Sequence, residues 1–149
     1  MNKAKIKICG ICSLDDALKA AELGADAIGF NFYSRSSRYI RPGLAEEISI
    51  QLPKKIWRVG VFVDAQPDDV ATIAKRVGLD FLQFHGDETP EFVSSFREIR
   101  TIKAIRLGQL EQIAGLKNWL GSTDYLLIDT ASSRAFGGTG EQVQEHLLA

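Results

Sequence analysis

Short apolar runs alternate with longer amphipathic segments along the whole chain. Their starts lie about 20 to 31 residues apart, which is the period of a strand–helix–strand unit and makes successive strands parallel. The runs are rich in Ile, Val, Phe and Leu and have the lengths of strands. Six such strands are predicted, over Lys5–Gly10, Ala27–Tyr33, Arg58–Asp64, Phe81–Asp87, Thr101–Leu107 and Tyr125–Thr130.

Helix signals lie between these runs. Leu14–Leu23 follows Ser13, which together with Asp16 resembles a capping box, and Gly24 ends the segment. Three further helices are predicted to begin at Pro42, Pro67 and Pro90, because proline is tolerated in the first helical turn. With no linker between the units, we predict one α/β domain over residues 1–149.

The length limits how far such a fold can close. A complete eightfold barrel usually takes roughly 200–250 residues, and this chain has 149. The fold is therefore either smaller than such a barrel or an incomplete barrel of about six parallel βα units, whose first and sixth strands would be open edges. We expect a homodimer to cover these edges, or the segment Glu141–Ala149 to repack over them, with Lys5 and Lys7 shielding the first strand.

Charge and composition limit the kinds of partner that we expect the chain to bind. The chain has 18 basic and 19 acidic residues and a pI near 6.1, which argues against nucleic acid and for a small molecule as the binding partner. No apolar run reaches the ~20 residues that span a bilayer, so we expect no membrane association and a cytoplasmic location. Two cysteines are too few for a disulfide framework.

Four reactive side chains lie at, or just beyond, the carboxyl ends of different runs, where parallel α/β folds place catalytic groups: Cys9, Arg38, His85 and Asp129. Each also has a purely structural interpretation. A lone cysteine is usually a small buried hydrophobe, and a strand-ending aspartate is often a cap. The histidine could simply hydrogen-bond its loop, so we assign it only to the lining of the site. The arginine could lie in a solvated loop, but a guanidinium fork matches a carboxylate, and Arg38 is the better candidate than Arg35.

The sequence GGTG at Gly137, Gly138, Thr139 and Gly140 could form a phosphate cradle, because glycines let backbone N–H groups approach an anion. It lacks the Lys-Ser/Thr of a P-loop, and a flexible loop is the simpler interpretation.

Seven motifs in order along the chain give a more specific indication. The chain resembles the phosphoribosylanthranilate isomerase family through KICGI at 7–11, GADAIGFNFY followed by SRSSRYI at 24–40, VGVFVD at 59–64, QFHGDE at 83–88, IKAIR at 102–106, LIDT at 127–130 and GGTG at 137–140.

The resemblance implies a (βα)8-barrel enzyme of tryptophan biosynthesis that converts a phosphorylated aminoaldose into an aminoketose by an Amadori rearrangement, without metal or cofactor. It implies that Cys9 is the general base, Asp129 the general acid and Arg38 the partner of the substrate carboxylate. Such a reaction needs one group that donates a proton and one that removes one. A helix beginning near Ser13 would favour a thiolate at Cys9. In that family, loops after strands seven and eight hold most of the phosphate, so we expect weakened turnover here.

Two alternatives of other classes stay open. The first is a barrel fragment that folds or self-associates without catalysis. The second is a dithiol oxidoreductase, because Cys9 and Cys12 form a C-x-x-C at a strand-to-helix turn. Thioredoxin-like folds mix in antiparallel strands and do not repeat six βα units, so this alternative is the weaker one. A metal site is weaker still, since two sulfurs and one distant histidine give at most three ligands.

Overall fold

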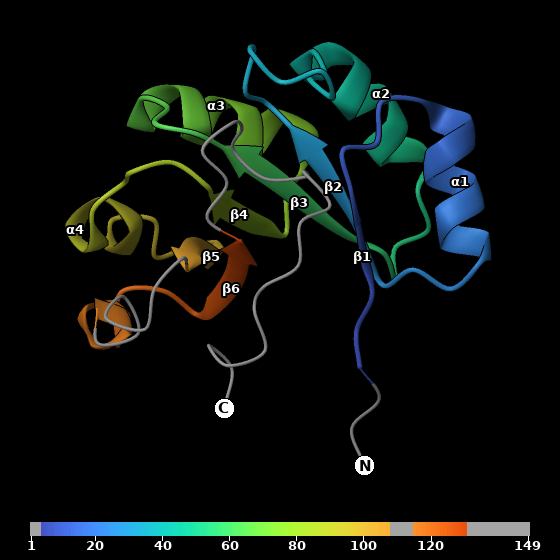
Figure 1. Cartoon of the computed structure of the whole chain (residues 1–149). Helices are drawn as coiled ribbons and strands as arrows, with labels where there is room; N and C mark the ends of the chain where they lie inside the picture. Colours follow the sequence, from blue (N-terminus) through green and yellow to red (C-terminus); the bar gives the residue numbers. More distant parts are fainter. Residues whose placement is uncertain (1–3, 108–114, 131–149) are drawn as a thin grey trace.

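A single sheet of six parallel strands, hydrogen-bonded in chain order, organises the molecule (Figure 1). The computed structural model describes residues 4–107 and 115–130. The strands are β1 (Lys7–Cys9), β2 (Ala27–Asn31), β3 (Trp57–Phe62), β4 (Phe81–Phe84), β5 (Arg100–Leu107) and β6 (Tyr125–Thr130). All five strand pairings are parallel. The predicted fold class, an incomplete barrel of parallel strands, is confirmed.

The helices begin where the sequence predicts. They are α1 (Leu14–Glu22), α2 (Pro42–Gln51), α3 (Pro67–Val77) and α4 (Pro90–Ser94), and a 3-10 helix, η1 (Gly115–Trp119), precedes β6. The Ser13 hydroxyl accepts a hydrogen bond from the Asp16 N–H at 3.2 Å, which confirms the predicted cap of α1. The segment Glu141–Ala149, predicted as one of two ways to cover the open edges, lies outside the described residues.

The main core lies between the helices and the convex face of the sheet. Phe30, Phe62 and Phe84 point from β2, β3 and β4 into this layer and are almost fully buried. The Phe84 ring lies within 5.2–5.5 Å, centroid to centroid, of the rings of Phe92 and Phe96 at α4. These large aromatic contacts fix the helices against the sheet.

Arg58, a charged residue within a predicted strand, stabilises a helix end. Its guanidinium donates to the carbonyls of Ser49 and Leu52, each at 3.0 Å, and to that of Ile56. The last carbonyls of a helix lack intrahelical partners, so a cation there satisfies groups at the end of α2.

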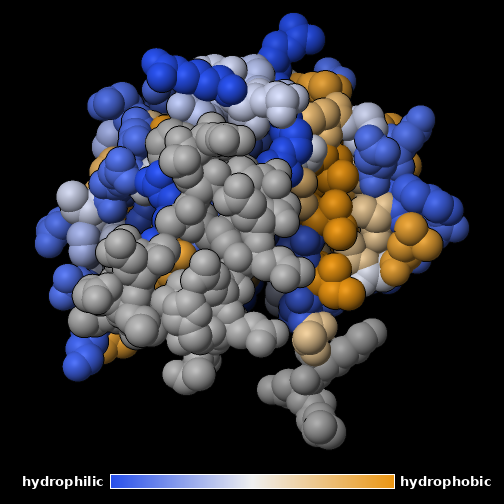
Figure 2. All heavy atoms as spheres, viewed as in Figure 1, coloured by the Kyte–Doolittle hydropathy of each residue, from blue (hydrophilic) through white to orange (hydrophobic). Residues whose placement is uncertain are grey.

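The concave face forms a mostly apolar hollow of about 340 Å³. Residues from both edge regions line it, including Lys5–Lys7 near β1 and Tyr125–Leu127 in β6. The sheet therefore curves enough for its two edges to border one space. Figure 2 shows hydrophobic side chains in a band on the face that carries β1.

The edge strands leave apolar side chains in contact with solvent. Ile6 and Tyr125 are each 51% exposed, and Ile8 and Leu126 are each 40% exposed. Within the described residues, β1 pairs only with β2, and β6 only with β5. Lys5 lines the hollow, where its ammonium lies 5.5 Å from the centre of the Trp57 ring and pairs with Asp26 at 2.8 Å. Lys7 is one of the residues that line the hollow.

Candidate active site

The alternation of side chains along each strand decides which residues share the concave face. Lys7, Phe81 and Leu127 line the hollow. Successive side chains of a strand point to opposite faces, so the residues two positions further along share this face. Those residues are Cys9, Gln83 and Asp129, and they lie toward the carboxyl ends of β1, β4 and β6. The predicted site residues of the first and sixth strands therefore lie at one rim of one hollow, at its opposite sides.

Cys9 ends β1 and is exposed. Its neighbour in register on β2 is Gly29, which has no side chain to cover the thiol. A Cβ atom at Gly29 would lie only 3.0 Å from Cys9 Sγ and 3.1 Å from Cys9 Cα. The Gly29 carbonyl also accepts hydrogen bonds from the N–H groups of Gly10 and Ile11, at 2.9 and 3.1 Å. The close approach of β2 thus fixes both the thiol and the loop that follows it.

Arg38 lies beside this loop. A Cβ atom at Gly10 would lie 2.6 Å from Arg38 Cδ, so the arginine side chain packs across the residue that follows Cys9. Gly10 also has a φ of +84°, which glycine adopts without strain. The carbonyl of Arg38 accepts a hydrogen bond from the Cys12 thiol at 3.3 Å. The loop after β2 therefore places a guanidinium next to the loop that follows Cys9.

His85 and Asp129 meet directly. His85 Nε2 lies 3.0 Å from Asp129 Oδ2, and both side chains are largely buried, at 11% and 23% exposure. On the other side of the ring, Gln83 Nε2 lies 3.1 Å from His85 Nδ1. With the amide nitrogen of Gln83 facing the ring, as it does in this structure, Nδ1 accepts from Gln83 and Nε2–H donates to Asp129. Gln83 Oε1 is buried and has no hydrogen-bond partner in the described part of the chain.

The surroundings of His85 favour its neutral form. Burial is the largest influence and lowers the pKa of His85 below 6.5. The hydrogen bond to Asp129 and the charge of its carboxylate oppose this shift, while the cations Lys103 and Arg106 add to it. At neutral pH the ring is therefore uncharged and orients the Asp129 carboxyl by a hydrogen bond.

The chain is similar in sequence to known proteins along nearly its whole length. A family model of N-(5'-phosphoribosyl)anthranilate (PRA) isomerase matches residues 6–149. The N-(5'-phosphoribosyl)anthranilate isomerase of Rubrobacter xylanophilus is 45% identical over 139 residues, which are 92% of this chain and 67% of that protein. The chain belongs to the N-(5'-phosphoribosyl)anthranilate isomerase family. This confirms the resemblance identified from the sequence motifs.

Solved structures of PRA isomerases agree with this membership. One, in complex with reduced 1-(o-carboxyphenylamino)-1-deoxyribulose 5-phosphate, superposes with a TM-score of 0.80 at 40% identity and covers 87% of this chain and 66% of that one. Another contains monomers generated from the dimeric enzyme of Thermotoga maritima. Its TM-score is 0.80 at 39% identity, and the match covers 86% of this chain and 64% of that one. This chain thus spans about two thirds of the length of these PRA isomerases.

Two residues of the rim were not assigned from the sequence. Gln83 lies two positions before His85 in the QFHGDE motif, and alternation along the strand could have placed both on one face. Arg106 ends the IKAIR motif, is paired in register with Asp129, and donates to Asp87 at 2.6 Å. Its position near the carboxyl end of a predicted strand is the signal in the sequence that could have identified Arg106 as a residue of the site. The glycine-rich stretch Gly137–Gly140 lies outside the described residues.

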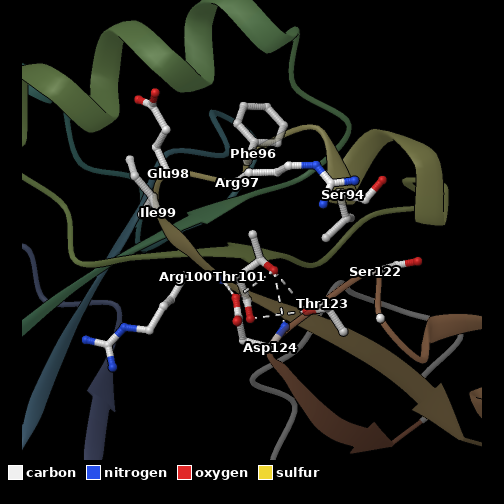
Figure 3. Close-up of a pocket in the computed structure, with 12 residues that line it drawn as sticks. Ser94, Phe96, Arg97, Glu98, Ile99, Arg100, Thr101, Ser122, Thr123 and Asp124 are labelled. Carbon is white, nitrogen blue, oxygen red and sulfur yellow. Dashed lines mark hydrogen bonds between the residues drawn. The ribbon is translucent and has the colours of Figure 1, made fainter.

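A second, polar pocket lies at the opposite end of the sheet (Figure 3). It has a volume of about 340 Å³ and contains none of the predicted site residues. Asp124, just before β6, accepts a hydrogen bond from the N–H of Thr101 at 2.7 Å, and Thr123 donates to the Thr101 carbonyl at 3.1 Å. These contacts join the amino ends of β5 and β6, so this pocket is bordered by structural hydrogen bonds.

Within residues 4–107 and 115–130, no group of three or more His, Cys, Asp or Glu side chains could hold a metal ion. No helix in the same residues is long and apolar enough to cross a membrane.

Proposed function

We propose that this chain catalyses the Amadori rearrangement of N-(5'-phosphoribosyl)anthranilate to the corresponding 1-amino-1-deoxyribulose in tryptophan biosynthesis. The observation that carries the proposal is the 3.0 Å contact between His85 and Asp129, at the rim that also carries Cys9. An oriented carboxyl and an exposed thiol at one hollow are the pair of groups that the reaction requires.

Asp129 is the general acid in this proposal. Its carboxyl group gives a proton to the furanose ring oxygen, the bond between C1′ and that oxygen breaks, and the anthranilate nitrogen lone pair forms a protonated Schiff base. His85, held by Gln83 on its far side, keeps one carboxyl oxygen in a fixed direction. Such positioning reduces the entropy lost on reaching the transition state.

Cys9 is the general base. The Schiff base acidifies the C2′ proton, and a thiolate at Cys9 removes it while the electrons of the C–H bond return to nitrogen through a new C1′–C2′ double bond. The resulting enol converts to the ketose when C1′ takes up a proton. Oxidation at C2′ balances reduction at C1′ within one molecule, so the reaction needs no external oxidant or reductant.

Arg38 is proposed to bind the anthranilate carboxylate. Its side chain packs over Gly10, next to Cys9 in the chain. A guanidinium can form two parallel hydrogen bonds to a carboxylate, which fixes the direction of the anthranilate ring as well as its position. The backbone of Gly137, Gly138, Thr139 and Gly140 is proposed to contact the substrate phosphate.

Steady-state conversion of N-(5'-phosphoribosyl)anthranilate by the purified chain tests this function. Asp129→Asn keeps the size of the side chain and removes its acid, so we expect turnover by the unmodified chain and a fall of about 100-fold or more in the variant. Equal rates in both proteins would refute the assignment of Asp129. No conversion by either protein would favour the non-catalytic barrel fragment.

The open edges support a second proposal, that two copies of this chain associate across the concave face. The exposed apolar side chains at β1 and β6 border the hollow, and burying them would gain about 25 cal/mol per Å². Sedimentation velocity should then give the mass of a dimer. Tyr125→Glu should shift the protein toward the monomer, whereas Leu23→Glu, which changes an exposed side chain on another face, should not. A monomer at every concentration would contradict association.

A further inference from the structure

A buried ammonium group lies on the face of the sheet opposite the candidate acid, because Lys103 follows Ile102, which lines the hollow. The side chains of Lys103 in β5 and Glu88 after β4 are only 4% and 2% exposed. Lys103 Nζ lies 2.8 Å from Glu88 Oε2. It also donates to the carbonyl oxygens of Gly86 at 2.7 Å and Phe84 at 3.4 Å. These three acceptors match the three donors of an ammonium group.

Two of those acceptors flank His85 in the chain. The carbonyls of Phe84 and Gly86 belong to the residues immediately before and after it, so one ammonium holds the backbone on both sides of the histidine. The His85 N–H itself donates to the Phe62 carbonyl of β3 at 2.8 Å. The backbone of His85 is therefore fixed from two neighbouring strands, while its ring extends to Asp129.

Glu88 fixes the same turn from its other side. Its carboxylate accepts hydrogen bonds from the N–H of Gly86, at 3.0 and 3.2 Å, and from the N–H of Asp64 at 2.9 Å. Asp64 follows β3 in a left-handed conformation, with φ of +48°, and accepts from the Asp87 N–H at 2.7 Å. The pair thus ties the middle of β5 to the carboxyl ends of β3 and β4.

Stability alone is a weak reason for such a pair. Removing two charges from water costs about as much as their attraction returns, and apolar replacements of similar volume are often as stable. What an apolar pair cannot do is hydrogen-bond the carbonyls of Phe84 and Gly86 and the N–H of Gly86. The geometry of the turn, rather than the stability of the fold, is the property that depends on these two side chains.

We infer that Lys103 and Glu88 are positioning residues, which hold the turn after β4 so that the His85 ring keeps one tautomer and stays within hydrogen-bond distance of Asp129. This inference rests on the proposed function for its catalytic consequence. Its structural part concerns the His85 ring and can be measured without turnover.

The test compares the full chain with the double variant Lys103→Met, Glu88→Gln. Nitrogen NMR of the imidazole at pH 7.5 should show the His85 proton on Nε2 in the unmodified protein and a mixture of tautomers in the variant. His146, the other histidine of the chain, is the internal reference. In steady-state kinetics, kcat should fall by about 10- to 100-fold with a much smaller change in KM, as expected for displacement of a reacting group by up to about 1 Å.

The matched control removes an exposed ion pair of the same length. Arg76→Met with Glu46→Gln breaks a 2.8 Å contact between α3 and α2, far from the turn after β4, and should leave tautomer and kcat unchanged. If the buried double variant does not fold, Glu88→Gln alone serves as the second variant, because its single amide oxygen cannot accept from both Lys103 and the Asp64 N–H as the two carboxylate oxygens do. The same loss of a single tautomer and the same fall in kcat are expected.

A variant that keeps a single Nε2–H tautomer and the kcat of the unmodified protein, whatever its stability, would overturn the inference. Failure of the proposed function looks different, because the unmodified chain would then show no turnover while the tautomer of His85 still responded to the loss of the buried pair.

Discussion

Gly29→Ala is the sharpest test of how closely β2 approaches the Cys9 thiol. The added Cβ atom would lie 3.0 Å from Sγ and 3.1 Å from Cα of Cys9, which is well inside the 3.5–4.0 Å at which carbon atoms attract one another. One of these neighbours is backbone, so turning the thiol away cannot relieve the contact. β1 has to move from β2 by a few tenths of an ångström.

Both stability and rate should respond. Overpacking costs about 1–3 kcal/mol, and replacing a strand glycine returns about 0.5–1 kcal/mol, so we expect a net loss of about 1 kcal/mol, and at most about 2.5 kcal/mol, in the free energy of unfolding. A shift of 1 Å in a reacting group costs about 100-fold in rate, so a shift of a few tenths of an ångström should lower kcat about tenfold or less.

Three measurements follow this change: urea denaturation, steady-state turnover, and the rate at which a thiol reagent modifies Cys9 in a Cys12→Ser background. Gly115→Ala is the matched control, because a Cβ atom there meets nothing within 4 Å. A Gly29→Ala protein with normal kcat and normal thiol reactivity would show that the position of Cys9 does not depend on β2.

Three other predictions concern the same rim. The pKa of His85 is lowered in the folded protein, so the unfolded chain binds more protons than the folded one below pH 6.5. The free energy of unfolding should therefore fall as pH drops from 6.5 through the pKa of the folded state. Urea titrations should show a smaller fall in the His85→Gln variant. Arg38→Ala should raise KM about 10- to 100-fold with less effect on kcat, while the exposed neighbour Arg35→Ala should not, and equal KM values in both variants would contradict carboxylate binding by Arg38. Cys12→Ser keeps a donor for the Arg38 carbonyl and should leave isomerase turnover unchanged, whereas a dithiol oxidoreductase would lose its activity in a disulfide-reduction assay.

Strand and helix positions could be predicted because local signals set them. Tyr125–Thr130 has the predicted bounds, and three helices begin at the predicted prolines. The fifth strand ends at Leu107 as predicted, but the ends of the first four strands were placed too far along. The run predicted over Arg58–Asp64 ends at Phe62, because the chain turns at Asp64, which adopts a positive φ to meet Glu88. That contact depends on tertiary structure and leaves no mark in the hydrophobic pattern.

The site was predictable as a set of strand ends, but its contacts were not. Parallel strands bring Cys9, His85 and Asp129 to one edge of the sheet, and the structure agrees. The hydrogen bond between His85 and Asp129 depends on the stagger of strands 44 residues apart in sequence. The role of Lys103 could not be predicted for a related reason. A lysine within an apolar strand is explained only by its ion pair with Glu88, and that contact depends on the tertiary structure.

The first strand is only three residues long and, in the described part of the chain, has a neighbour on one side alone. Backbone amide hydrogens of such an edge strand exchange with solvent after small local openings, which need less free energy than unfolding of the whole molecule. The thiol proposed as the base is carried by the shorter of the two strands that end the described sheet. Gentle warming should therefore abolish turnover at temperatures where circular dichroism still reports intact helices. A ligand that contacts both β1 and β6 should bring the temperature at which turnover is lost closer to the temperature at which the helices unfold.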